Sequence, residues 1–471
     1  MAGLYATLNQ TVMALSAHSR AIELTGKNLA NVNNPDYARQ RVIYGDRGVV
    51  VTPTGVESLG LEAVGVQQIR DALLDQQVTR EIALKAMFLA EQSGFRQAQA
   101  GLGQTIDRAN AASGAGAADT NGLAGAIDSF FTAFQSFAAR PTDDGERQTL
   151  LQKATILTDR FHLADTRLAQ VQTDLNAEIA TDVSAANGLL TAIADLNAQI
   201  GRFELNAPGT AVDLRDQRQA QIEKLAALLP VEVRSVVNGQ VQLVTKDGGG
   251  ADVVLVDLAN VQGTLAFNGT QFTAGAPATV LGLAGGSMQG ALAARDGAVQ
   301  TLRDELDVLA RQFVVAVNGA YNPTNATGDF FVAGGLTAAS INLVGTLTAA
   351  NLKASDGGPA GDNTIALAVA DLGGRTFSTG AGDLIDGTFS SFFGRSVSSL
   401  GQALSDANVR LENQENIERL VRTQRDAVSG VSLDEEMADL MKYQRSFQAS
   451  SRVFNVLDEL LDGIVNRLGV G

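Results

Sequence analysis

The chain has 471 residues, which is enough for about three domains of ordinary size. It contains no cysteine, and this excludes disulfides, thiol nucleophiles and cysteine metal sites. Its 51 acidic and 35 basic residues give a net charge of −16, so neither nucleic acid nor an anionic membrane surface is expected as a partner.

The N-terminal stretch has the pattern of an amphipathic helix. An apolar residue recurs at every seventh position, namely Met1, Leu8, Leu15, Ile22 and Leu29. We predict a helix to about Asn28 whose narrow apolar stripe needs a partner helix. Arg20 and Glu23 interrupt this stretch, so a cleaved signal peptide is not expected. No run of about 18 apolar residues predicts a membrane span anywhere in the chain.

A turn-forming segment follows the first helix. It contains four asparagines and one proline, at Asn28, Asn31, Asn33, Asn34 and Pro35. Asparagine side chains cap backbone groups and tolerate left-handed conformations, and proline ends a helix. We therefore predict a stiff turn here and short extended pieces between Gly45 and Gly65.

The centre of the chain alternates between helical and extended patterns. Helical spacing of apolar residues predicts helices over 69–95, 123–140, 146–203, 214–229, 288–313 and from about 400 onward. From Val231 the period changes to two around Asn238-Gly239, the preferred dipeptide of a type I′ hairpin turn. The segment 321–387 is rich in Gly, Ala and Thr, and we expect short strands and loops there.

The C-terminal stretch from Ser432 mirrors the N-terminal one. Ser432 and Glu435 form the sequence pattern of a helix capping box. Every seventh residue is again apolar, at Leu433, Leu440, Phe447, Phe454, Leu461 and Leu468. We predict that the two terminal helices pair; the alternative is that each is an ordinary amphipathic helix on a globular core.

These patterns predict a mainly α protein with an inserted β domain. The expected terminal assembly domain comprises 1–45 with 428–471, and its long helices form a coiled-coil bundle. The expected helical rod domain comprises 46–230 with 283–322 and 388–427. The small outward β domain is expected in 231–282 with 323–387.

No catalytic, cofactor or metal site is predicted. The histidines His18 and His162 fall on separate predicted helices with no cysteine to join them in a metal site. Gly26-Lys27 lacks the first glycine and the Ser/Thr of a phosphate-binding loop. The protein is therefore not expected to be an enzyme.

Two short signatures suggest a family. The first comprises Asn28, Asn31, Asn33, Pro35, Tyr37, Arg39 and Gln40, and the second comprises 428–436 followed by Gln444 and Arg445. Both resemble the terminal signatures of bacterial flagellar rod, hook and hook-associated proteins, although Asp36 stands where that group often has glycine. Between them, Leu214–Arg218, Val231–Val233, Gly285–Ser287 and Gly328–Phe331 resemble the hook-associated protein 1 family, in order along most of the chain.

This resemblance implies a structural subunit of the bacterial flagellum at the hook–filament junction. It implies self-assembly into a ring through the terminal helices, with Leu8, Leu15, Ile22, Leu29 and the C-terminal heptad residues at subunit interfaces. The implied partners are further copies of the chain, the hook protein, the second hook–filament junction protein and a flagellar export chaperone. The implied location is extracellular, reached by flagellar type III export. The alternatives are a secreted coiled-coil adhesin, a free-standing enzyme with helical ends, or another axial subunit of the hook or rod.

Overall fold

The computed structural model describes residues 2–467 except 47, 53–54, 59, 103–121, 326–327 and 360. The described chain is mainly helical with small antiparallel sheets, which confirms the predicted fold class. It divides into two compact units. Unit 1 contains Met1–Lys85, Val183–Gly286 and Gln414–Gly471, and unit 2 contains Ala86–Asp182 and Ser287–Asn413. The division falls within the long helices α2 (Ala72–Leu102), α5 (Asp144–Phe203) and α10 (Phe389–Ser429).

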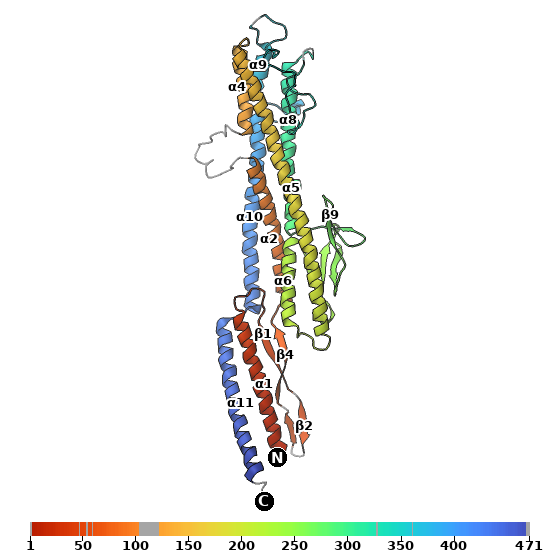
Figure 1. Cartoon of the computed structure of the whole chain (residues 1–471), viewed down its shortest axis with the longest axis vertical. Coiled ribbons are helices and arrows are strands. Elements are labelled where there is room, and N and C mark those ends of the chain that lie inside the picture. The colour runs from red at the N-terminus through yellow and green to blue at the C-terminus, as the bar shows by residue number, and fades with distance from the viewer. Residues whose placement is uncertain are drawn as a thin grey trace. The chain divides into compact units, whose positions relative to one another are not determined.

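The two terminal helices of unit 1 lie side by side (Figure 1). They are α1 (Ala2–Ala30) and α11 (Leu433–Arg467), and their pairing confirms the partner that the two heptad patterns predicted for each other. Helix α1 also packs against the antiparallel strands β1 (Gln40–Asp46) and β4 (Leu61–Gln68). Strands β2 (Val49–Thr52) and β3 (Gly55–Ser58) form a second two-stranded ribbon, so this segment is extended as expected.

The rest of unit 1 combines α6 (Val212–Leu228) and the C-terminal part of α5 with two small sheets. The first contains β5 (Glu232–Ser235), β6 (Val241–Lys246), β7 (Asp252–Asp257) and β8 (Asn260–Val261), and the second β9 (Leu265–Phe267), β10 (Phe272–Ala274) and β11 (Thr279–Val280). Asn238 and Gly239 both have positive φ, at 54° and 70°, and the Gln240 N–H donates to the Val237 carbonyl at 3.2 Å, within the short 3₁₀ segment η1 (Val237–Gly239). This is the predicted type I′ turn.

Unit 2 is built around a cluster of phenylalanines. Its elements include α4 (Leu123–Ala139), α7 (Ser287–Ala294), the π-helical turn η2 (Arg295–Val299), α8 (Gln300–Tyr321), α9 (Thr364–Asp371) and the 3₁₀ turn η3 (Thr379–Ala381). Ring centroids lie 5.0 Å apart for Phe130–Phe134 and for Phe313–Phe389. The clustered rings are all buried: Phe130, Phe131, Phe134, Phe137, Phe161, Phe313, Phe330, Phe331, Phe377 and Phe389.

The segment 323–387 differs from the sequence prediction that it completes the β domain. Its described residues contain α9 and two isolated bridges, Phe331–Leu343 and Phe377–Gly387, but no strand. The segment lies in unit 2, whereas β5–β11 lie in unit 1. The physical reason is that its phenylalanines pack into the aromatic core through turns, so it needs no ladder of strand hydrogen bonds.

Candidate assembly interface

Asn28 links the end of α1 to the turn that follows it and to the start of α11. Its side chain is 2% exposed. Its Nδ2 donates to the Gln40 carbonyl at 2.8 Å and to Glu436 Oε2 at 3.0 Å. Its Oδ1 accepts from the Tyr37 hydroxyl at 2.7 Å and from the Gln40 N–H at 3.1 Å. Because the buried amide of Asn28 donates to α11 and also accepts from the turn, the conformation of the turn depends on the position of α11.

Arg39 makes the charged part of the same connection. Its Nε donates to Glu436 Oε1 at 2.7 Å, and its Nη1 donates to Glu435 Oε2 at 2.5 Å. Asp439 Oδ2 lies 3.5 Å from Nη2, and the Arg39 N–H donates to the Ser429 carbonyl at 2.8 Å. The Glu436 side chain is only 3% exposed, so its charge depends on Arg39 and Asn28 for solvation.

The local electrostatics keep these groups in their donor and acceptor roles. Burial, together with the carboxylates of Asp216, Asp213 and Glu436, raises the pKa of Tyr37, so its hydroxyl stays protonated and donates. Burial alone would lower the pKa of Arg39, but its acidic neighbours raise the pKa overall. The cluster therefore keeps its hydrogen-bond pattern throughout the neutral range.

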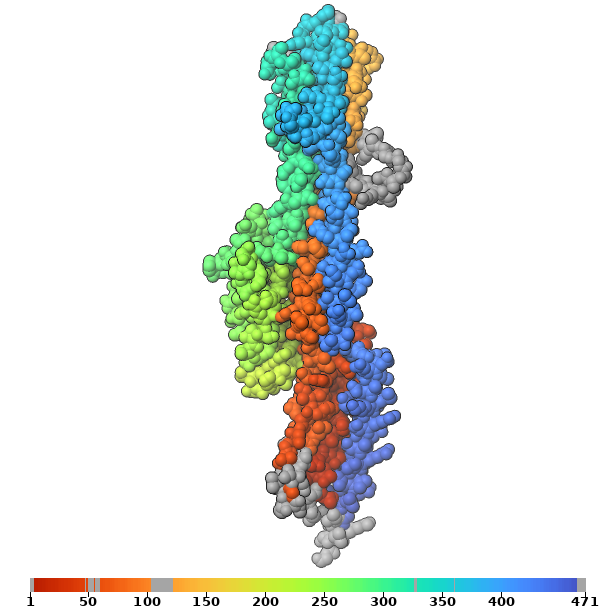
Figure 2. Space-filling view, turned by 180° about the vertical axis from the view of Figure 1, so that it is seen from behind, coloured from red at the N-terminus to blue at the C-terminus, as the bar shows by residue number. Residues whose placement is uncertain are grey.

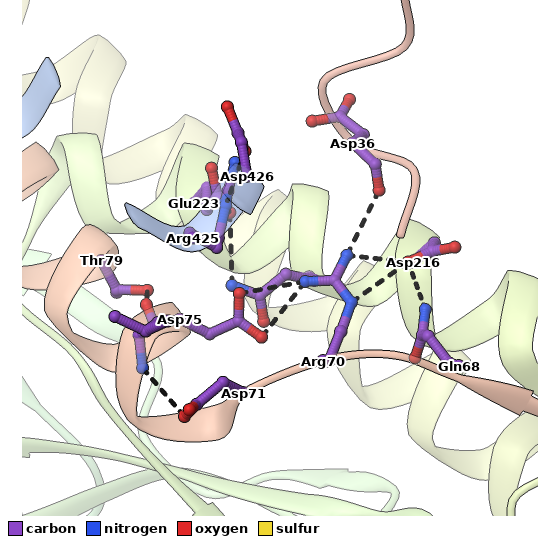
Figure 3. A network of polar contacts seen from close by, with 12 residues as sticks. Asp36, Gln68, Arg70, Asp71, Asp75, Thr79, Asp216, Glu223, Arg425 and Asp426 are labelled. Atoms are coloured by element: carbon purple, nitrogen blue, oxygen red, sulfur yellow. Dashed lines mark hydrogen bonds and ion pairs between the residues drawn. The ribbon is translucent and has the colours of Figure 1, made fainter. Parts of the chain in front are cut away.

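A second layer of contacts fixes the turn to α6 and to the start of α2 (Figure 3). Arg70 Nη2 donates to Asp216 Oδ1 at 2.7 Å and to the Asp36 carbonyl at 3.3 Å, and Arg70 Nη1 contacts both oxygens of Asp75. Gln68 also donates to Asp216. Burial raises the pKa of Asp216 to about 6, and Arg70 opposes part of that rise.

Lys27 and Gln40 contact α6 as well. Lys27 Nζ lies 2.7 Å from Asp213 Oδ1, and Gln40 Nε2 donates to the same oxygen at 3.0 Å. The Gly26-Lys27 dipeptide only partly matches a phosphate-binding loop, and in the structure Lys27 forms an ion pair with Asp213. Asp216 belongs to the Leu214–Arg218 motif and Asp213 directly precedes it, but the sequence did not indicate these contacts.

The remaining signature residues lie around this cluster. Asn31 Nδ2 donates to the Lys27 carbonyl at 3.0 Å, and Asn34 Oδ1 accepts from the Asp36 N–H at 3.1 Å. These are local contacts that close the end of α1 and shape the turn. Other signature side chains are exposed, namely Asn33, Pro35, Gln444 and Arg445.

The predicted interface residues are only partly covered by the α1–α11 pair. Half-buried positions are Leu8, Leu15, Ile22, Leu29, Leu440 and Phe454, while Leu461 is 8% exposed. Leu433 and Phe447 are exposed, at 52% and 36%. Leu468 lies outside the described residues.

The helix pair also exposes apolar side chains outside the seventh-residue rows. On α11 these are Met437, Met441, Val453, Val456 and Leu460, and on α1 they are Tyr5 and Val12. In Figure 2, side chains of α11, drawn in dark blue, project from the helix. Exposed apolar groups gathered on one helix pair are typical of a surface that another protein covers.

Residues 2–467, apart from the six undescribed stretches between them, contain no group of three His, Asp or Glu side chains that could hold a metal ion. His162 Nε2 lies 2.8 Å from the Ile341 carbonyl, and His18 is in α1. None of the helices in that part of the chain is long and apolar enough to span a bilayer.

Comparisons with known proteins identify relatives. Residues 114–329 match the family described as "Flagellar hook-associated protein FlgK helical domain", and residues 423–468 match "Flagellar basal body rod FlgEFG protein C-terminal". Flagellar hook-associated protein 1 of Bacillus subtilis is 26% identical over 514 residues, which cover 97% of this chain and 97% of that protein. The chain is a relative of flagellar hook-associated protein 1. The resemblance seen in the sequence is thereby confirmed.

Two further comparisons give similar proteins. Flagellar hook-associated protein 1 of Salmonella typhimurium is 23% identical over 571 residues, covering 98% of this chain and 99% of that protein. The solved structure of the flagellar hook junction protein FlgK from Burkholderia pseudomallei aligns with a TM-score of 0.46 and 23% identity. That alignment covers 55% of this chain and 46% of the other.

Proposed function

We propose that this chain is a structural subunit of the bacterial flagellum, without catalytic activity, that joins the hook to the filament. In this proposal it assembles into a ring through α1 and α11. The observation that carries the proposal is the terminal helix pair, which exposes Leu433, Met441 and other apolar side chains although its register is fixed by the buried Asn28–Glu436 contact. Further copies of the chain supply the apolar cover that one copy lacks.

The remaining partners follow from the position of such a subunit. It contacts the hook protein on one side and the second hook–filament junction protein on the other, and a flagellar export chaperone holds it before export. It leaves the cell by flagellar type III export without a cleaved signal peptide and acts outside the cell. The match of residues 423–468 to a rod-protein C-terminal family supports an axial role in general. An axial subunit elsewhere in the hook or rod is therefore the second candidate.

The decisive experiment places a charge on the interface. Phe447 is 36% exposed on α11, so Phe447→Asp is expected to leave the folding of the single chain nearly unchanged. In the assembled ring, the same carboxylate is buried against a neighbouring copy, which costs several kcal/mol or forces the group to take up a proton. Because a ring repeats one contact, every subunit carries this cost. Cells are expected to secrete the variant, release unassembled flagellin and fail to swim.

The matched control is Gln448→Asp, the adjacent exposed position, which introduces the same charge in place of a polar residue. It is expected to be much milder in attached-filament counts. Normal filaments in cells that carry Phe447→Asp would exclude the proposed interface. Immunogold labelling of the wild-type chain then separates the two candidates, because label along the hook or rod instead of at its junction with the filament would favour the second.

A further inference from the structure

Arg218, at the end of the Leu214–Arg218 motif, is a buried cation without a carboxylate of its own. It lies in α6 and is 7% exposed. Its Nη1 donates to Asn197 Oδ1 and to the Gly239 carbonyl, both at 2.8 Å. These contacts fix α6 to the end of α5 and to the turn between β5 and β6. Among the described residues, Nε and Nη2 have no acceptor and no acidic group forms an ion pair with Arg218.

The two neighbouring arginines differ from Arg218 in this respect. Arg215 directs its Nε and Nη2 at the two oxygens of Glu204, which is a bidentate pair. Arg70 contacts Asp75 and Asp216. Burial and the charges of Arg215 and Arg70 lower the pKa of Arg218 to about 10, and the charge of Glu204 opposes this only in part. The cation at position 218 is therefore under-compensated in its surroundings.

Arg218 lines a cavity of about 340 Å³ within unit 1. The walls come from the end of β4, the start of α2, α6 and strand β5. Polar groups predominate in them, including Gln68, Arg70, Gln76, Arg215, Arg218 and Ser235. Asp75 is the acidic residue among the described wall residues, and both of its oxygens already accept from Arg70.

We propose that this cavity binds one small oxyanion, of the phosphate or carboxylate class, on the Nε–Nη2 edge of Arg218. That edge presents two parallel N–H groups whose spacing matches two oxygens of a carboxylate or phosphate. Arg215 shows the same geometry with Glu204 in the same wall. The volume is at the lower end of the range for small-ligand sites and leaves room for an ion of a few heavy atoms together with water.

A bound anion has a definite structural consequence. Arg218 already joins α6 to the β5–β6 turn, and an anion that neutralises it removes the cost of its buried charge. The anion therefore stabilises unit 1 and leaves unit 2 unchanged. This role is independent of ring assembly, because the cavity residues lie outside α1 and α11.

The test is thermal unfolding of the full chain in phosphate, acetate or chloride at equal ionic strength, with hydrogen exchange to assign the response to a unit. Phosphate or acetate is expected to raise the unfolding midpoint of unit 1 in a saturable way and to slow exchange in β5 and β6. Chloride at the same ionic strength is expected to do neither. A saturable rise with either oxyanion supports the site, and the anion that gives the larger rise at equal concentration identifies the class of ligand.

Two substitutions assign the effect to Arg218. Arg218→Lys retains the charge but loses the paired donors, so the apparent affinity is expected to fall about tenfold. Arg218→Gln is expected to abolish the response. Arg234→Gln is the matched control, since Arg234 in β5 carries the same charge on the surface and pairs with Glu232 and Asp252.

The proposal fails if phosphate and acetate stabilise unit 1 no more than chloride does. It also fails if Arg218→Gln responds as the wild type does. Should Arg218→Gln not fold, Arg218→Lys and isothermal titration of the wild type with phosphate and with acetate decide the question. An unchanged affinity in the lysine variant, or no binding of either anion to the wild type, would overturn the assignment.

Discussion

The aromatic cluster of unit 2 and the terminal helix pair of unit 1 are held together in opposite ways. In the cluster, the rings of Phe130, Phe134 and Phe313 are each 0% exposed, and Phe130 contacts Phe134 edge-on and Phe313 at a tilt. In the terminal pair, most apolar residues are half-buried or exposed, and the fully buried groups include the polar Asn28 and Glu436. The cluster buries its apolar side chains within itself. The terminal pair sets its register by polar contacts and leaves apolar side chains exposed.

The largest expected effect lies in the cluster. Phe130 contacts five other rings, so Phe130→Ala leaves a cavity that close-packed neighbours fill only in part. We expect the free energy of unfolding of unit 2 to fall by about 3–5 kcal/mol. Denaturant titration followed by hydrogen exchange on α4 and α8 measures this. A loss below about 1 kcal/mol would show that the cluster is not the core that its burial indicates.

A smaller effect is expected when the charged contact of the terminal pair is broken. Arg39→Gln leaves the Glu436 carboxylate buried and without its cation, which costs about 2–3 kcal/mol. Hydrogen exchange in the first turns of α11 is expected to accelerate, while exchange in unit 2 is unchanged. Arg41→Gln is the control, two residues further along the chain in β1, since Arg41 is exposed and its guanidinium donates to Gln67. Equal effects of the two changes would contradict the role given to Arg39.

The smallest expected effect is a pH dependence confined to unit 1. Asp216 has a folded-state pKa of about 6 against an ordinary value of 3.8, so the folded state binds this proton more tightly. The resulting stabilisation is complete below pH 3.8 and is lost as pH rises through about 6. As the pH falls from 7 to 5, Asp216 therefore adds about 1 kcal/mol to the free energy of unfolding of unit 1. His18 contributes in the opposite direction, because burial lowers its pKa.

Comparison with Asp216→Asn isolates this contribution, because His18 is common to both proteins. The difference in unfolding free energy between wild type and variant is expected to change by about 1 kcal/mol over this pH range. Chemical denaturation at pH 5, 6 and 7 measures it. A pH-independent difference would show that Asp216 keeps its charge throughout, held by Arg70.

The sequence predicted the elements better than their contacts. The heptad rows predicted α1 and α11, because an apolar stripe is a local pattern, and they predicted the pairing because both narrow stripes need a partner helix. Asn238-Gly239 predicted its turn because few dipeptides accept two positive φ angles. The prediction of strands in 323–387 was wrong. A composition rich in Gly and Thr is compatible with a series of turns as well as with strands.

The candidate site was predicted in part for a related reason. Resemblance to a family indicated Asn28, Tyr37, Arg39 and Gln40, but not the groups that these residues contact. Asn28 and Glu436 are 408 positions apart, and Gln40 and Asp213 are 173 apart. No local periodicity encodes such a contact, because it depends on how whole helices are placed and not on spacing along any one of them.

That separation of 408 positions also sets an order of events during synthesis. Helix α1 is among the first segments to leave the ribosome, and α11 follows only after the residues up to 433 have been made. A nascent or truncated chain therefore carries α1 without its partner and without the carboxylate that orients the turn after it. The Asn28–Glu436 contact can therefore form only in a chain that has been translated from α1 through the start of α11.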